Sequence, residues 1–141
     1  MSGLDAVVDT NVFITARNPH EVGYAACRKV LDLIDRGDLT AVVSTVTIAE
    51  IRAGLSPEEI PTFWKAMLTH LLTSPNYRVE PVDADIAEAA GDLRASKRLA
   101  LPDALIVATG RLRNASFLVT QDQALGRRQE ILKIVLPKDV V

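Results

Sequence analysis

Short apolar runs rich in valine alternate with longer segments of helical periodicity, and this alternation limits the possible folds more than any other feature of the chain. The apolar runs have the length of buried strands and span Ala6–Val8, Thr40–Val43, Tyr77–Val82 and Phe117–Val119, with Ile131–Leu136 as a candidate for a last strand. Strands that alternate with helices pair in parallel through right-handed crossovers. We therefore expect an α/β fold of three layers, α/β/α, with a central, mainly parallel sheet.

The intervening segments carry the signals of helix starts and stops. Thr10 and Asn11 read as a turn after the first strand, and the expected helices span about 21–36, a segment capped by Ser44 or Thr45, 56–72, 83–99 and 101–113. Gly37 is a natural C-terminal stop for the first of these helices. Pro57 and Pro102 lie at first-turn positions, where a proline is tolerated.

Length and composition indicate one ordinary globular domain over residues 1–141. The chain is 48% hydrophobic and 24% charged, unlike a disordered sequence. Cys27 is the single cysteine, and the start Met1–Asp5 lacks the positive segment and apolar stretch of a secretion signal. No apolar run reaches the roughly 20 residues that span a bilayer. We expect a cytoplasmic protein with no membrane role.

The formal net charge of −2 does not by itself advertise nucleic-acid binding, but the charges are unevenly distributed. Cations crowd the C-terminal half at Arg94, Lys97, Arg98, Arg111, Arg113, Arg127 and Arg128. If these cations flank an acidic pocket, they could hold a phosphate backbone beside it. A solvated helix face is an equally good interpretation of the group.

Four carboxylates, from Asp9, Glu50, Asp103 and Asp122, each follow closely on an apolar run. Side chains at the carboxyl ends of parallel strands converge on one crevice, even when they are far apart in sequence. Taken singly, Asp103 is an ordinary first-turn acid, Asp122 a turn residue and Glu50 an exposed helical residue. Asp9 is harder to dismiss, since a charge at the end of a buried strand needs solvent, donors or a cation.

Clustered carboxylates repel one another and would take up protons, whereas a divalent cation reverses that balance. Ligation by oxygen alone selects hard ions, so we expect Mg²⁺ or Mn²⁺ rather than zinc. Such an ion activates water and stabilises charge that develops on a phosphate. The predicted chemistry is phosphodiester hydrolysis. We assign no catalytic role to Cys27, which is expected to be packed, or to His20 and His70.

Four sequence blocks resemble the PIN-domain ribonucleases, and in particular the VapC-type toxins of toxin–antitoxin pairs. The blocks are Val8-Asp9-Thr10-Asn11-Val12, Ile48-Ala49-Glu50-Ile51, Leu101-Pro102-Asp103-Ala104-Leu105-Ile106 and Leu118-Val119-Thr120-Gln121-Asp122. They stand in the family's order and at about its spacings. The resemblance covers nearly the whole chain.

The resemblance implies roles for individual residues. Asp9 and Asp103 match the most direct metal ligands, Glu50 an acid that completes the site, and Asp122 a fourth, more variable acid. Polar positions that hydrogen-bond and orient these acids are matched by Thr10, Asn11 and Thr120. The resemblance further implies an Mg²⁺- or Mn²⁺-dependent endoribonuclease, a homodimer and a VapB-like antitoxin. Candidate RNA contacts are Arg98, Arg127 and Arg128.

Two alternatives deserve comparison. A haloacid-dehalogenase-type phosphatase also begins with an aspartate after an apolar strand, but its motif needs a second aspartate where this chain has Asn11. The other alternative is a catalytically silent PIN-like module that binds RNA or a protein. The presence of all four acids weighs against a degraded site.

Overall fold

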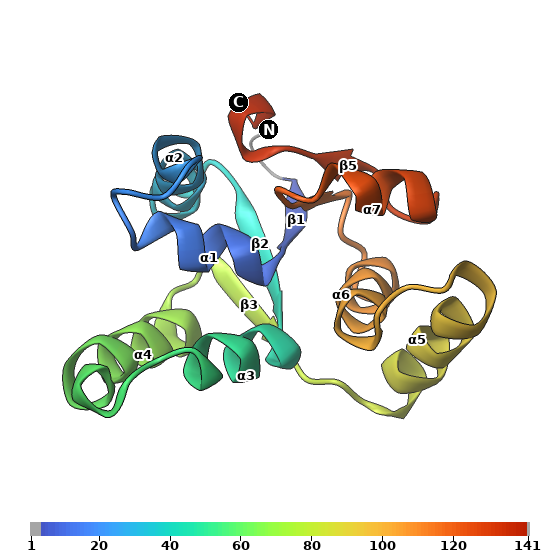
Figure 1. Ribbon diagram of the computed structural model, residues 1–141, viewed down its shortest axis with the longest axis horizontal. Helices are drawn as coiled ribbons and strands as arrows, with labels where there is room; N and C mark the ends of the chain where they lie inside the picture. Colours follow the sequence, from blue (N-terminus) through green and yellow to red (C-terminus); the bar gives the residue numbers. More distant parts are fainter. Residues whose placement is uncertain (1–3, 141) are drawn as a thin grey trace.

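Five parallel strands form one sheet in the order β3-β2-β1-β4-β5 (Figure 1). The computed structural model describes residues 4–140, so the Met1–Gly3 part of the expectation about a secretion signal lies outside the described residues. The strands are β1 (Asp5–Val8), β2 (Thr40–Ser44), β3 (Tyr77–Glu80), β4 (Phe117–Val119) and β5 (Ile134–Val135). β1 therefore lies in the middle of the sheet, β2 and β3 extend the sheet to one side of it, and β4 and β5 extend it to the other.

Helices cover both faces of this sheet, which confirms the expected three-layer α/β architecture. The α-helices are α1 (Thr10–Ala16), α2 (Tyr24–Asp35), α3 (Thr45–Ala53), α4 (Lys65–Thr73), α5 (Ala84–Lys97), α6 (Leu101–Leu112) and α7 (Gln123–Arg128). Two 3₁₀ turns, η1 (Pro57–Glu59) and η3 (Pro137–Asp139), and one π turn, η2 (Ile60–Trp64), complete the structure. Within residues 4–140, none of the helices has both the length and the apolar character that a membrane crossing requires.

Alternation along the strands divides the core into two halves. Ala6 and Val8 of β1 face the half formed with α1 and α2, whereas Val7 faces the half formed with α5 and α6. This is the period of two that a strand imposes, and all three side chains are fully buried. A strand buried on both faces reads as a continuous apolar run. Figure 1 shows α1, α2 and α4 to one side of the strands, and α5 and α6 to the other.

The reading of Thr10 and Asn11 as a turn is wrong, because α1 begins at Thr10. Asp9 caps this helix: its Oδ1 accepts from the Thr10 N–H at 2.8 Å. The segment from Thr10 to Ala16 is rich in β-branched residues, which have low helix propensity. Burial of Val12, Phe13 and Ala16 against the sheet outweighs that propensity.

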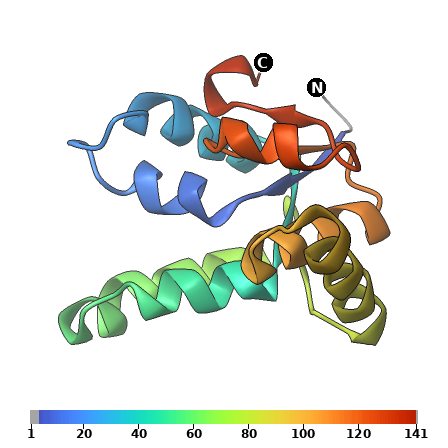
Figure 2. The ribbon, with the colours of Figure 1, turned by 45° about the vertical axis from the view of Figure 1, so that its right-hand side comes forward.

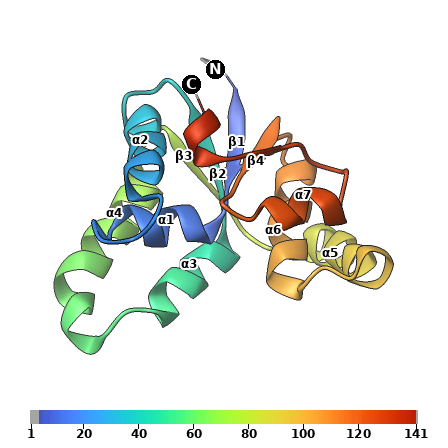
Figure 3. The same ribbon diagram turned by 45° about the horizontal axis from the view of Figure 1, so that its top comes forward.

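The largest differences in bounds concern three expected elements, and α7 is a further helix that was not expected. β3 ends at Glu80, before Pro81, which lacks an N–H for the ladder. The last strand shrinks to two residues. The expected helix over 56–72 is a 3₁₀ turn and a π turn before α4. Figures 2 and 3 show α3 and α4, in green, reaching out past the end of the sheet.

Candidate acidic metal centre

The four predicted acids stand on elements that meet near the carboxyl ends of β1 and β4. Asp9 directly follows β1, Asp122 caps α7 just after β4, Glu50 lies on α3 after β2, and Asp103 lies in the first turn of α6. The strand order reverses between β1 and β4, since β1 leads outward to β2 while β4 follows on its other side. In open α/β sheets, ligands bind in the crevice at such a switch point.

Asp9 is the most buried of the four acids, with 7% of its surface exposed. Its carboxylate accepts hydrogen bonds from three donors: the Thr10 N–H at 2.8 Å, the Thr120 hydroxyl at 2.7 Å and the Asn11 amide at 3.3 Å. These donors fix the orientation of the carboxylate. Two of them lie on α1 and the third follows β4, so the contacts also tie these two elements together.

Burial is the largest influence on the pKa of Asp9 and raises it. The hydrogen bonds from Thr120 and Thr10 lower this pKa, the charges of Asp103 and Glu50 raise it, and the net shift is upward. The pKa of Asp103 is raised by burial and then by the charges of Asp122 and Glu50, while Arg128 lowers it. Each of the four carboxylates is thus within electrostatic reach of another. The site concentrates negative charge that its own cations do not balance.

Glu50 is held by a hydroxyl rather than by a cation. The Thr10 hydroxyl lies 2.6 Å from Glu50 Oε1 and 2.9 Å from the hydroxyl of Thr47, one turn earlier on α3. Thr10 therefore serves two acids, Asp9 through its backbone N–H and Glu50 through its side chain. This double use joins α1 to α3 at the acidic edge.

Thr120 links Asp9 to Asp122. Its hydroxyl donates to Asp9 and accepts from the Asp122 N–H at 3.1 Å and from the Asn11 amide at 3.1 Å. Asp122 itself is exposed, and its Oδ1 accepts from the Ala124 N–H at 3.0 Å as the cap of α7. Thr10, Asn11 and Thr120 therefore all hydrogen-bond to the acids, and their orienting role stays a prediction.

Gln121 is a contributor to this arrangement that sequence reasoning missed. Its side-chain amide donates to Thr15 Oγ1 at 2.8 Å, and its backbone N–H donates to Asn11 Oδ1 at 3.3 Å. Gly23 gives this side chain room, because a Cβ there would come within 2.5 Å of Gln121 Oε1. The position of Gln121 between Thr120 and Asp122 was the only signal in the sequence.

The donor set suits a hard divalent cation, although the side chains stand apart. All four acids supply oxygen. The charges of neighbouring acids help to raise the pKa of Asp9 and of Asp103, and a bound cation would reverse that effect. Among residues 4–140, no three acidic, histidine or cysteine side chains are gathered closely enough to hold an ion as they stand. Carboxylates that repel one another need such a charge between them to converge.

The cations of the C-terminal half have different surroundings. Arg127 and Arg128 are exposed in the last turn of α7, and the charge of Arg128 acts on Asp103. Arg98 is also exposed, and it ends α5 with a left-handed backbone. The described contacts place only Arg128 within reach of the acids. It is therefore the cation best located to act at the site.

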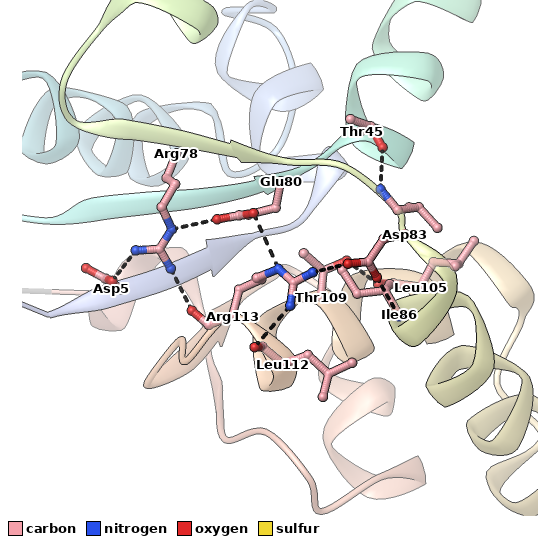
Figure 4. Close-up of polar contacts among 11 residues, drawn as sticks. Asp5, Thr45, Arg78, Glu80, Asp83, Ile86, Leu105, Thr109, Leu112 and Arg113 are labelled. Carbon is pink, nitrogen blue, oxygen red and sulfur yellow. Dashed lines mark hydrogen bonds and ion pairs between the residues drawn. The ribbon is translucent and has the colours of Figure 1, made fainter.

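Arg113 is committed to the fold rather than to the acidic site. It pairs with Glu80 at 3.4 Å and with Asp83, the cap of α5, as Figure 4 shows. Arg78 pairs with the same Glu80 at 2.9 Å and with Asp5 at 2.8 Å. Both arginines thus join β3 to neighbouring elements. Because its charge is already paired with Glu80 and Asp83, Arg113 is excluded as a candidate phosphate contact.

Cys27 and the two histidines have no place in the acidic site. Cys27 is fully buried, and burial raises the pKa of its thiol to about 11, so it is a packed group as expected. His20 is exposed in a loop. His70 Nε2 lies 2.9 Å from Asp35 Oδ1, and its ring packs against Tyr77.

A parallel sheet with acids around its switch point defines the broad class of α/β proteins that bind ligands at the carboxyl ends of their strands. The sequence model of the PIN domain matches residues 6–131. The chain therefore belongs to the PIN domain family, whose members are generally nucleases. This confirms the resemblance seen in the sequence. A comparison with curated protein sequences finds no match.

Several solved structures share the fold of this chain. VapBC2 from Rickettsia felis, bound to a DNA fragment from its promoter, has a chain with 20% identity and a TM-score of 0.70, which covers 94% of this chain and 98% of its own. A chain of a toxin–antitoxin complex from Klebsiella pneumoniae has 23% identity and a TM-score of 0.70, and the match covers 96% of this chain and 99% of that one. A chain of FitAcB from Neisseria gonorrhoeae has 21% identity and a TM-score of 0.70, and the match covers 96% of this chain and 99% of that one. At these identities the likeness establishes the fold.

Proposed function

We propose that this chain is a divalent-metal-dependent endoribonuclease and the toxin of a VapBC-type toxin–antitoxin pair. The observation that carries the proposal is the environment of Asp9: a carboxylate 7% exposed, at the switch point of the sheet, with its pKa raised by burial and by two other acids. Ionisation of Asp9 at this crevice costs free energy in the folded protein, because burial and the neighbouring acids disfavour its negative charge. A bound cation relieves that cost.

The residues that would hold Mg²⁺ or Mn²⁺ are Asp9, Glu50, Asp103 and Asp122. When bound, the ion supplies activation of water and stabilisation of negative charge for phosphodiester hydrolysis. The chain orients the acids through Thr10, Asn11 and Thr120, which donate hydrogen bonds to Asp9 or Glu50. No side chain of the chain is required as a nucleophile.

The partners proposed for the chain follow from its family and its neighbours. RNA is the substrate, a VapB-like antitoxin is the inhibitor, and a homodimer is the working assembly. The neighbouring structures support this proposal, since those from Rickettsia felis and Klebsiella pneumoniae are described as VapBC2 and as a toxin–antitoxin complex. We propose the cytoplasm as the compartment of this chain, because its proposed substrate is RNA.

A catalytically silent PIN-like module that binds RNA or a protein is the second candidate. It is favoured by one observation, namely that among residues 4–140 no three potential ligands are gathered for an ion. The two candidates differ in what the acids do. In the silent module, removal of an acid would leave binding unchanged and there would be no cleavage to lose.

Cleavage of RNA by the purified chain tests the proposal. We expect cleavage with Mg²⁺ or Mn²⁺, none with a chelator, and none after Glu50→Gln in the presence of the ion. Glu88→Gln on α5, an exposed glutamate outside the site, is the matched control and should cleave like the wild type. If the wild type cleaves no RNA with either ion, the silent module is favoured. If Glu50→Gln cleaves normally, the assigned site is wrong.

Manganese should stabilise the folded protein more at pH 8 than at pH 5. Asp9 and Asp103 have raised pKa values in the folded protein. Their contribution to its stability is therefore fully present below pH 3.8, their ordinary pKa, and is lost as the pH rises through their pKa values in the folded state. The ion competes with protons for the same carboxylates, so it binds better at high pH. At 100 times its dissociation constant, an ion adds about 2.7 kcal/mol to the free energy of unfolding. Urea denaturation at both pH values measures this, with NaCl of equal ionic strength as the control. Equal effects at the two pH values would contradict the prediction.

Removing Arg127 and Arg128 together should weaken RNA affinity and flatten its dependence on salt. For single-stranded nucleic acid, each phosphate contact contributes about −0.7 to the slope of log affinity against log salt concentration. Loss of two contacts should therefore make the slope less negative by about 1.4. Fluorescence anisotropy of a labelled RNA measures the slope, in protein inactivated by Asp103→Asn. The control is the double variant Lys29→Ala and Lys65→Ala, which removes the same charge from exposed positions on α2 and α4. An identical slope in both double variants would mean that Arg127 and Arg128 do not contact phosphates and belong to a solvated helix face.

A further inference from the structure

Thr47 lies on α3 one turn before Glu50, and its side chain is fully buried. Residues three apart on a helix share a face, so both side chains point toward α1. The Thr47 hydroxyl lies 2.9 Å from Thr10 Oγ1. Within residues 4–140, the Thr47 hydroxyl makes this hydrogen bond and no other. A buried hydroxyl with a single partner is strongly oriented by that partner.

The number of available protons fixes the direction of the hydrogen bonds. Thr10 Oγ1 contacts two oxygens, Glu50 Oε1 at 2.6 Å and Thr47 Oγ1 at 2.9 Å, but a hydroxyl carries one proton. An ionised carboxylate can only accept, so the Thr10 proton goes to Glu50. Thr47 must then donate its own proton to Thr10 Oγ1. The result is a directed chain from Thr47 through Thr10 to Glu50.

We propose that Thr47 is a positioning residue of the acidic site, which acts on Glu50 through Thr10. A threonine in a helix divides between two χ1 rotamers, so Thr10 at the start of α1 needs a partner to stay in one of them. The donated hydrogen bond from Thr47 selects the rotamer in which the Thr10 hydroxyl reaches across to α3. Glu50 thereby keeps a fixed direction at the acidic edge. The importance of that direction for ion binding and cleavage rests on the proposed function.

The test compares Thr47→Val, which keeps the shape but has no hydroxyl, with Thr47→Ser, which keeps the hydroxyl. The first readout needs no metal and no RNA: the three-bond NMR couplings of Thr10 Cγ2, which report its χ1. We expect couplings of a single rotamer in the wild type and in Thr47→Ser, and averaged couplings in Thr47→Val. Thr47→Ala takes the place of Thr47→Val if the valine variant does not fold.

Ion binding and cleavage give the second readout. We expect Mn²⁺ affinity, measured by calorimetry, to fall at least about 10-fold in Thr47→Val, as is typical when an orienting partner of a ligand is lost. In Thr47→Val, kcat should fall similarly, while KM for RNA should stay within about twofold of the wild-type value. Thr47→Ser should restore both the Mn²⁺ affinity and kcat. Single-rotamer couplings in Thr47→Val, or equal losses in the two variants, would overturn the assignment. If the wild type neither binds Mn²⁺ nor cleaves RNA, the proposed function fails, while the couplings still decide the role of Thr47.

Discussion

Replacing Asp9 by asparagine should abolish RNA cleavage and, without metal, make the protein more stable at neutral pH. We expect the cleavage rate to fall by more than about 100-fold, beyond the 10- to 100-fold that is typical for residues that only orient a ligand. The gain in stability follows from the burial that raises the pKa of Asp9. Its ionised form is unfavourable in the folded protein, and asparagine carries no charge.

The sign of the stability change depends on pH. The folded-state pKa of Asp9 lies above its ordinary value of 3.8, so protonated Asp9 stabilises the fold below that value, and this contribution is lost as the pH rises through the folded-state pKa. Asp9→Asn should therefore gain on the order of 1 kcal/mol at pH 7.5, as other relieved functional sites do. The gain should disappear in acid.

Urea denaturation of wild type and Asp9→Asn, without metal and at several pH values, measures this difference. Asp92→Asn on α5, an exposed aspartate outside the site, is the matched control and should change neither activity nor stability. A less stable Asp9→Asn at pH 7.5 would mean that the hydrogen bonds from Thr10, Asn11 and Thr120 outweigh the cost of burial. That result would remove the electrostatic argument for a cation at this site.

Asp103→Asn should abolish cleavage without changing the fold. Within the described residues no hydrogen-bond donor reaches the Asp103 carboxylate, and the charge of Arg128 is what favours its ionised form. Its carboxylate is therefore available to an ion, and its loss should disturb few contacts. We expect a loss of cleavage of more than about 100-fold and Mn²⁺ affinity weaker by at least about 10-fold.

Calorimetry with Mn²⁺ and a cleavage assay test this second prediction, and circular dichroism tests the fold. Asp92→Asn again serves as the control, because it removes the same charge from a helix on the same side of the sheet. An active Asp103→Asn protein would exclude Asp103 as a ligand. Normal Mn²⁺ binding with lost cleavage would instead give Asp103 a role in contact with RNA.

The strands were predictable because their sequences leave few alternatives. Valine-rich runs such as Ala6–Val8 are buried on both faces, and that pattern is visible in the sequence itself. α1 was not predictable in the same way. Its β-branched residues disfavour a helix, and only packing against the sheet makes Thr10–Ala16 helical. Local propensity was overridden by tertiary contacts.

The acids of the candidate site were predicted from their positions after apolar runs, although the run before Asp103 lies between two helices rather than in a strand. Their supporting contacts were not predicted. Thr47 and Gln121 act through partners 37 and 106 residues away, and no local pattern predicts such pairs. Arg113 and Arg128 look alike in the sequence. Yet Arg113 pairs with Glu80 and Asp83, whereas the charge of Arg128 lowers the pKa of Asp103. The metal-ligating role of the four acids stays a prediction.

The central claim is that RNA cleavage by this chain depends on the carboxylates at the switch point of the sheet, and one measurement tests it most directly. The wild-type chain and Asp9→Asn are expressed briefly in cells, and new RNA 5′ ends are mapped across the transcriptome. We predict discrete new ends and growth arrest with the wild type alone. Identical profiles from the two folded proteins would contradict the account and favour a module that binds without cutting.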